Sequence, residues 1–159
     1  MERVRKNKHQ SGFSLIELMI VIAIIGILIG VGGYAWRSAI KRANETSAIT
    51  TLNNLAKYQQ DYQLTHRGSF GSFDDLIRDA GLDKAFAGDK PVVNGYVFTI
   101  KVIPKSPNQP ASYSVNADPQ VATGIGATGK RYFYIDNNVG GVRVNDNQPA
   151  GPDDESLLQ

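Results

Sequence analysis

The stretch SGFSLIELMIVIAIIGILIG, residues Ser11–Gly30, decides how the rest of this sequence is interpreted. No charged side chain occurs from Leu18 to Trp36. At about 1.5 Å per helical residue, roughly 20 apolar residues cross a hydrocarbon core about 30 Å thick. A soluble domain of this size could hardly cover such a helix on all sides. The segment therefore predicts a membrane-spanning helix.

A basic leader precedes this helix. Residues 1–12 contain Arg3, Arg5, Lys6 and Lys8 against the single acid Glu2. Lys and Arg flanking a spanning segment stay on the cytoplasmic side, so the C-terminal part of the chain is expected outside. An ordinary secretory signal is cut after its apolar core, whereas this leader ends directly before the core. A cut at that point would remove the charges and keep the helix.

One carboxylate, Glu17, interrupts the start of the apolar stretch. An acid in the bilayer costs a few kcal/mol on insertion scales and usually has a partner. A favourable interaction with the helix macrodipole is the simpler explanation, but it supplies only about 0.3–1 kcal/mol. We therefore expect Glu17 to have a partner in its functional state.

The segment Gly12-Phe13-Ser14-Leu15-Ile16-Glu17 and the apolar helix behind it resemble the prepilin processing motif of type IV pilins and of type II secretion pseudopilins. The resemblance implies that a membrane peptidase cuts between Gly12 and Phe13 and that the new amine of Phe13 is N-methylated. It further implies that Glu17, the fifth residue after the cut, pairs with the amine of a neighbouring subunit during filament assembly. Such pairing in lipid would favour the correct axial register.

Four glycines follow in the second half of the apolar stretch. Gly26 and Gly30 form a G-x-x-x-G pattern, and Gly32 and Gly33 come next. Small residues allow membrane helices to approach closely, and glycines also make a helix easier to unwind. Both roles, helix packing and flexibility, stay open.

The remainder of the chain predicts an α+β head in which a long N-terminal α-helix packs on a small antiparallel β-sheet, as in pilins. Apolar residues recur at helical spacing after Trp36 and stop near His66-Arg67-Gly68. A capping box at Ser72 and Asp75 predicts a short helix over 73–80. Segments rich in aromatic and β-branched residues predict four strands, at 96–102, 112–115, 131–135 and 141–144.

These patterns divide the chain into five parts. We expect a basic leader over 1–12, a transmembrane or filament-core helix over 13–36 and its amphipathic continuation over 37–67. A globular head follows over 68–148. The acidic residues near the C-terminus predict a flexible tail over 149–159.

Composition and motifs give little support to catalysis. The chain has a formal net charge of +2 and the leader +3, which leaves −1 for the remainder and argues against a nucleic-acid partner. The segment GIGATGKR, 124–131, matches two nucleotide-binding patterns, but strand-like residues follow where a helix is required. His9 and His66 have no visible catalytic partner. We predict a protein that is not an enzyme.

No cofactor is expected, and calcium is the one metal that stays open. Type II major pseudopilins, which the N-terminal motif resembles, carry a C-terminal calcium site. Asp136, Asp146, Asp153 and Asp154 supply oxygen donors of the right kind, but their spacing does not match that pattern. The absence of cysteine excludes a disulfide and a thiolate metal site.

The sequence thus predicts a pilin-like structural subunit, cut by prepilin peptidase and polymerised with copies of itself through its N-terminal helix. The resemblance implies an assembly platform and motor as partners, and a bacterial inner-membrane precursor that becomes an extracellular or periplasmic filament. A pseudopilin of type II secretion is the first alternative, and an uncleaved membrane-anchored binding module the second. The sequence does not distinguish a surface pilus from a secretion or DNA-uptake filament, nor a major from a minor subunit.

Overall fold

The computed structural model describes residues 12–138 and 140–157, and these residues are the ones to which the following description applies. The chain divides into two compact units, Met1–Ser38 and Ala39–Gln159. The helix α1, Leu15–Thr65, contributes residues to both. The leader predicted over 1–12 lies outside the described residues except for Gly12. Each unit is described by itself.

In the first unit, α1 carries the apolar stretch recognised in the sequence. It begins at Leu15, after three residues without regular structure, and runs without interruption past Ser38. Among the described side chains of its apolar part, none is buried. Within the described residues α1 is the one helix long and apolar enough to cross a membrane, by the criteria of length and composition.

In the second unit, the later part of α1 buries one face. Ala48, Leu52, Leu55 and Tyr62 recur at steps of three, four and seven residues and are all buried, as the amphipathic pattern requires. The helix ends at Thr65, close to the predicted stop. Gly68, with a φ of +85°, then donates its N–H to the carbonyl of Gln63 at 3.0 Å and reverses the chain.

A buried amide attaches the next segment to α1. Gln59 is fully buried, donates to the carbonyl of Gly71 at 2.6 Å and accepts from the Gly71 N–H at 3.0 Å. Helix α2, Phe73–Asp79, follows directly, and its predicted capping box between Ser72 and Asp75 is confirmed. A single 3₁₀ turn, η1 Lys84–Phe86, leads into the sheet.

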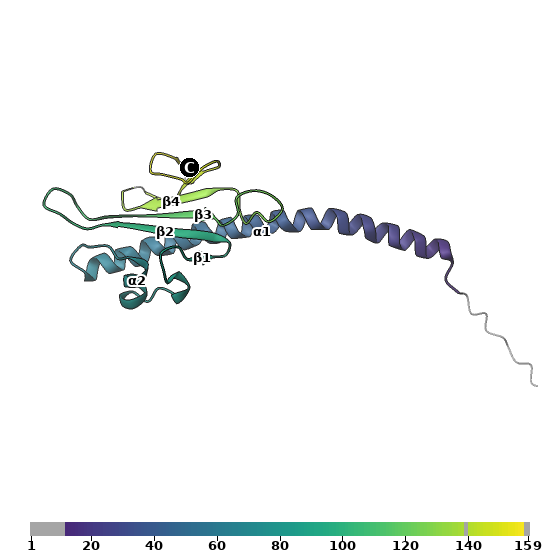
Figure 1. The fold of residues 1–159 in the computed structure, drawn as a ribbon, viewed down its shortest axis with the longest axis horizontal. Coiled ribbons are helices and arrows are strands. Elements are labelled where there is room, and N and C mark those ends of the chain that lie inside the picture. Colours follow the sequence, from purple (N-terminus) through teal and green to yellow (C-terminus); the bar gives the residue numbers. More distant parts are fainter. Residues whose placement is uncertain (1–11, 139, 158–159) are drawn as a thin grey trace, which may run out of the picture. The chain divides into compact units, whose positions relative to one another are not determined.

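The sheet is antiparallel throughout and its strand order follows the chain, β1-β2-β3-β4-β5-β6. The strands are β1 Val92–Val93, β2 Tyr96–Ile103, β3 Ser112–Pro119, β4 Tyr132–Asp136, β5 Arg143–Asn145 and β6 Glu155–Ser156. In Figure 1, the part of α1 that belongs to the second unit lies against the strands β2 and β3. The predicted α+β fold, a long helix packed on an antiparallel sheet, is confirmed.

Aromatic side chains fill the space between helix and sheet. Phe98 and Phe133 are completely buried, and Phe86 packs edge-on against Phe98 at 5.5 Å between ring centroids. Tyr96 and Phe133 lie 5.8 Å apart. Each such ring removes a large apolar area from water, so these rings contribute strongly to the packing of the core.

The sheet is larger than the sequence predicted. The two additional strands, β1 and β6, have two residues each, too few to show an alternating pattern. The flexible tail predicted over 149–159 is wrong for residues 149–157. Ala150 is buried, β6 pairs with β5, and Leu157 packs against the core. These backbone and packing contacts outweigh the acidic composition of the segment.

Candidate functional site

The predicted cleavage point lies in an exposed, non-helical segment. Gly12, Phe13 and Ser14 precede the first residue of α1 and adopt no regular structure. The Phe13 side chain is 91% exposed. The peptide bond between Gly12 and Phe13 is therefore free of helical hydrogen bonding and open to an approaching enzyme. The roles of both residues stay predictions.

Glu17 has a local partner that the sequence interpretation missed. Its Oε2 accepts the backbone N–H of Ser14 at 2.9 Å, one turn before it. This contact is one half of a capping box, in which the residue at the third helical position bonds back to the residue before the helix. The S-x-x-E spacing of Ser14 and Glu17 is the signal that predicts it. The contact satisfies one carboxylate oxygen and leaves the charge unpaired among the described residues.

The helix behind Glu17 exposes apolar side chains in all directions. Isoleucines at positions 20, 22, 24, 25, 27 and 29 are between 47% and 71% exposed. Soluble monomers rarely expose contiguous apolar surface of this extent, which marks a membrane or protein contact. The segment therefore requires lipid or other helices around it.

The predicted packing glycines lie in this same exposed stretch. A Cβ added at Gly26, Gly30, Gly32 or Gly33 would meet no atom within 4 Å. No contact inside the described chain requires glycine at these positions. The two predicted roles, close approach of another helix and flexibility, therefore both stay predictions.

The GIGATGKR segment forms a closed loop instead of a phosphate-binding turn. Thr128 donates its N–H to the Val121 carbonyl at 2.8 Å, and its hydroxyl accepts the Val121 N–H at 3.1 Å. Asn44 of α1 donates to the Thr128 carbonyl at 2.8 Å. Strand β4 follows the loop, so the helix N-terminus that would bind phosphate in either nucleotide motif is missing.

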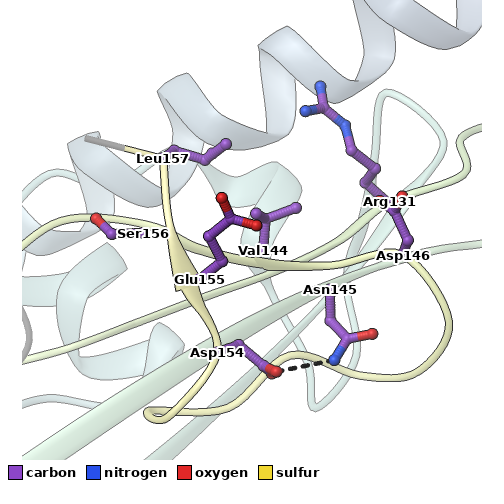
Figure 2. A pocket seen from close by; sticks show the side chains of 8 residues that line it. All are labelled: Arg131, Val144, Asn145, Asp146, Asp154, Glu155, Ser156 and Leu157. Atoms are coloured by element: carbon purple, nitrogen blue, oxygen red, sulfur yellow. Dashed lines mark hydrogen bonds between the residues drawn. The ribbon is translucent and has the colours of Figure 1, made fainter. Parts of the chain in front are cut away.

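A polar groove with a volume of about 650 Å³ lies beside the last two strands. Figure 2 shows its lining side chains, which come from the β4 end of the loop, from β5 and from β6. Asp146 and Asp154, two of the four candidate calcium ligands, line it. Both are engaged: Asp146 lies 3.4 Å from Lys130 Nζ, and Asp154 accepts from Asn145 at 2.9 Å.

The four aspartates do not form a common site. Asp136 lies at the end of β4, where it accepts from the Tyr134 hydroxyl at 2.9 Å and the Asn138 N–H at 2.8 Å. Asp153 is exposed. Over residues 12–138 and 140–157, no group of three or more His, Cys, Asp or Glu side chains has an arrangement that could hold a metal ion. The geometry therefore does not support a calcium site formed by these aspartates.

Known proteins are similar to this chain over its N-terminal region. A family model for the prokaryotic N-terminal methylation motif matches residues 7–33. The type IV wide pilus major component PilA4 of Thermus thermophilus is 47% identical over 57 residues, which are 36% of this chain and 44% of that protein. The type IV major pilin protein PilE1 of Neisseria gonorrhoeae is 43% identical over 60 residues, 38% of this chain and 36% of PilE1.

One similarity extends further along the chain. The fimbrial protein EcpC of Eikenella corrodens is 38% identical over 97 residues, which cover 58% of this chain and 54% of that protein. The matches thus span only about a third to a half of these relatives. No solved structure matches the chain significantly. The motif and these relatives together show that the N-terminal part of the chain is similar to type IV pilins.

Proposed function

We propose that this chain is made as a membrane-anchored precursor, cut between Gly12 and Phe13, methylated at Phe13 and polymerised through α1 into a pilus-like filament. The observation that carries the proposal is the methylation motif, matched over residues 7–33, whose helical part has no buried apolar side chain among the described residues. Its relatives are named as pilins and fimbrial proteins, which favours a pilus subunit over a pseudopilin.

The uncovered helix serves two environments in turn. In the precursor, its apolar side chains face lipid acyl chains, which require no polar partner. In the filament, the same side chains pack against the helices of other copies. The transfer from lipid to a helical bundle therefore exchanges one apolar environment for another, and the chain needs no second surface for it.

Glu17 supplies the register of this assembly. Its Oε2 accepts the Ser14 N–H, while its negative charge has no cationic partner among the described residues. Cleavage creates a cationic amine on Phe13, the residue before Ser14. Pairing of a Glu17 carboxylate with the amine of a neighbouring copy removes two uncompensated charges from the apolar bundle at once, so a slipped register is disfavoured.

Three kinds of partner follow from this role. Prepilin peptidase cuts and methylates the precursor, and an assembly platform with its motor extracts the subunit from the bacterial inner membrane. Further copies of the chain form the filament. The filament lies on the extracellular or periplasmic side, where the basic leader places the second unit.

Intact-mass measurement of the protein from membranes and from sheared surface material tests the proposal. We expect the sheared fraction to contain a chain that begins at Phe13 and carries one additional methyl group. A chain that retains residues 1–12 in every fraction would contradict processing, and would favour an uncleaved membrane-anchored module. A processed chain found only in the cell envelope would favour a short periplasmic filament over a surface pilus.

A further inference from the structure

The loop between Val121 and Lys130 combines a rigid base with an apolar tip. Between Val121 and Thr128 the residues are Ala, Thr, Gly, Ile, Gly and Ala, so Ile125 is the one large apolar side chain. It is 80% exposed, and Val121 at the base is 42% exposed. Burying this large aliphatic side chain against an apolar environment would be favourable.

Contacts with α1 hold the base of this loop in place. Asn44 donates to the Thr128 carbonyl at 2.8 Å, and the buried Glu45 accepts the Lys130 N–H at 2.9 Å. Glycine is required nearby, because a Cβ on Gly95 would lie 2.9 Å from Thr128 Cβ. The tip is thus presented from a fixed base on the helix.

The loop itself contains no acid, although the exposed Asp146 lies 3.4 Å from Lys130 Nζ at its end. No Asp or Glu occurs between Asp118 and Asp136. Lys41 and Arg42 lie on α1 just before the residues that hold the loop, and within the described part of the chain neither forms an ion pair. An apolar tip on a loop held by α1 directly after two unpaired cations has the chemistry of a segment that enters the interface of an anionic membrane.

The α1 residue that holds this loop follows the proposed anchor closely in sequence. Asn44 follows Trp36, the end of the uncharged stretch, by eight residues. Eight residues span about 12 Å as a helix and at most about 29 Å fully extended. The stretch of chain between the proposed anchor and the residue that holds the loop is therefore short.

We propose that, before assembly, the loop 121–130 docks on the outer surface of the membrane that holds α1, with Ile125 in the headgroup region and Lys41 and Arg42 facing anionic lipid phosphates. This inference rests on the membrane-anchored state in the proposed function. The contact would hold the second unit against the bilayer until the subunit is extracted. Lipid then covers the Ile125 side chain, both in the precursor and in the processed subunit.

The test uses the full chain in vesicles of phosphatidylcholine with and without phosphatidylglycerol. The chain has no cysteine, so Thr123→Cys gives a unique fluorophore site beside Ile125, and Asn108→Cys gives a matched site at the opposite end of β3. Trp36 is the single tryptophan and reports insertion of the anchor. Lipids with a quencher on the headgroup test whether each dye lies at the membrane surface. Lipids with a quencher on the acyl chain test whether Trp36 lies in the bilayer.

We expect quenching of the dye at position 123, stronger with phosphatidylglycerol, and none at position 108. Adding Ile125→Asn should abolish the quenching at 123 while leaving that of Trp36 unchanged. Equal quenching at 123 and 108 with Trp36 quenched would overturn the inference. So would a signal that disappears at high lipid-to-protein ratio, because it would indicate contact with a second copy. If Trp36 itself is not quenched, the membrane anchor in the proposed function fails instead.

Discussion

Glu45 on α1 and Arg131 at the end of the loop before β4 form an ion pair, with 2.8 Å between Arg131 Nε and Glu45 Oε2. The Glu45 side chain is 9% exposed, and its other oxygen accepts the Lys130 N–H at 2.9 Å. Tyr96 adds a hydrogen bond from its hydroxyl to the Arg131 carbonyl at 2.9 Å. One buried carboxylate thus connects the helix to the sheet.

Replacing this carboxylate should destabilise the second unit. Glu45→Gln leaves Arg131 without its charge partner, and we expect a loss of about 1–3 kcal/mol in unfolding free energy. This is below the roughly 3–5 kcal/mol for a fully buried pair, because the Arg131 side chain is 37% exposed and can turn to water. Urea unfolding of the chain in detergent measures the loss. Asp146→Asn, which removes the exposed pair with Lys130, should change it by less than about 1 kcal/mol.

Substitution of Gly129 tests how tightly the base of the loop is packed. A Cβ at this position would lie 2.7 Å from Cζ of the Tyr96 ring, which is completely buried and cannot move aside. Gly129→Ala should therefore cost about 1–3 kcal/mol in unfolding free energy, the usual range for overpacking. Gly126→Ala in the same loop meets no atom within 4 Å and serves as the matched control. Equal thermal unfolding midpoints for the two variants would contradict the close packing of Gly129 against Tyr96.

Asp118 should make stability depend on pH. Burial raises the pKa of its carboxyl above the ordinary 3.8, although nearby Lys90 opposes the shift, and Oδ1 is buried without a hydrogen-bond partner among the described residues. A raised folded-state pKa means that the protonated form is favoured on folding. Stability therefore falls as the pH rises from below 3.8 through the folded-state pKa.

Asp118→Asn removes this penalty. We expect the variant to be more stable than the parent chain near neutral pH and to match it well below 3.8, where the aspartate is protonated in both states. Urea midpoints recorded across this range give the comparison. A stability difference that stays constant with pH would show that ionisation of Asp118 is not its source.

The sequence predicted the elements whose signals are local. The apolar stretch, the amphipathic continuation and the Ser72–Asp75 capping box each depend on residues within a few positions of one another. Strand β2 and the first half of β3 also follow from their own composition, whereas the prediction missed the second half of β3, which extends to Pro119. The α+β fold could be predicted from these pieces because such a helix has a face to bury and such a sheet needs one covered.

The parts that were missed depend on distant partners. β6 is a strand because β5 lies beside it, and the segment 149–157 is ordered by contacts that its acidic composition does not reveal. The role of Glu45 depends on Arg131, which follows it by 86 positions. At the N-terminal site the motif identifies the candidate residues, whereas the environment that acts on them, lipid or other copies, is external to the chain.

Glu17 allows the capping and pairing explanations to be separated. Its carboxylate accepts the Ser14 N–H at 2.9 Å, and a Gln side chain at this position keeps a carbonyl oxygen that can accept the same hydrogen bond. Glu17→Gln therefore retains the cap and loses the charge, whereas Glu17→Leu loses both. If the acid serves to pair with a neighbouring amine, both variants should be cut after Gly12 and both should yield few filaments. If it serves only as a cap, the Gln variant should assemble like the parent chain and the Leu variant should lose no more than the roughly 0.5–2 kcal/mol of a helix cap. The amount of sheared filament per cell, measured together with the N-terminal mass, decides between the two, and parental yield from Glu17→Gln would end the register argument.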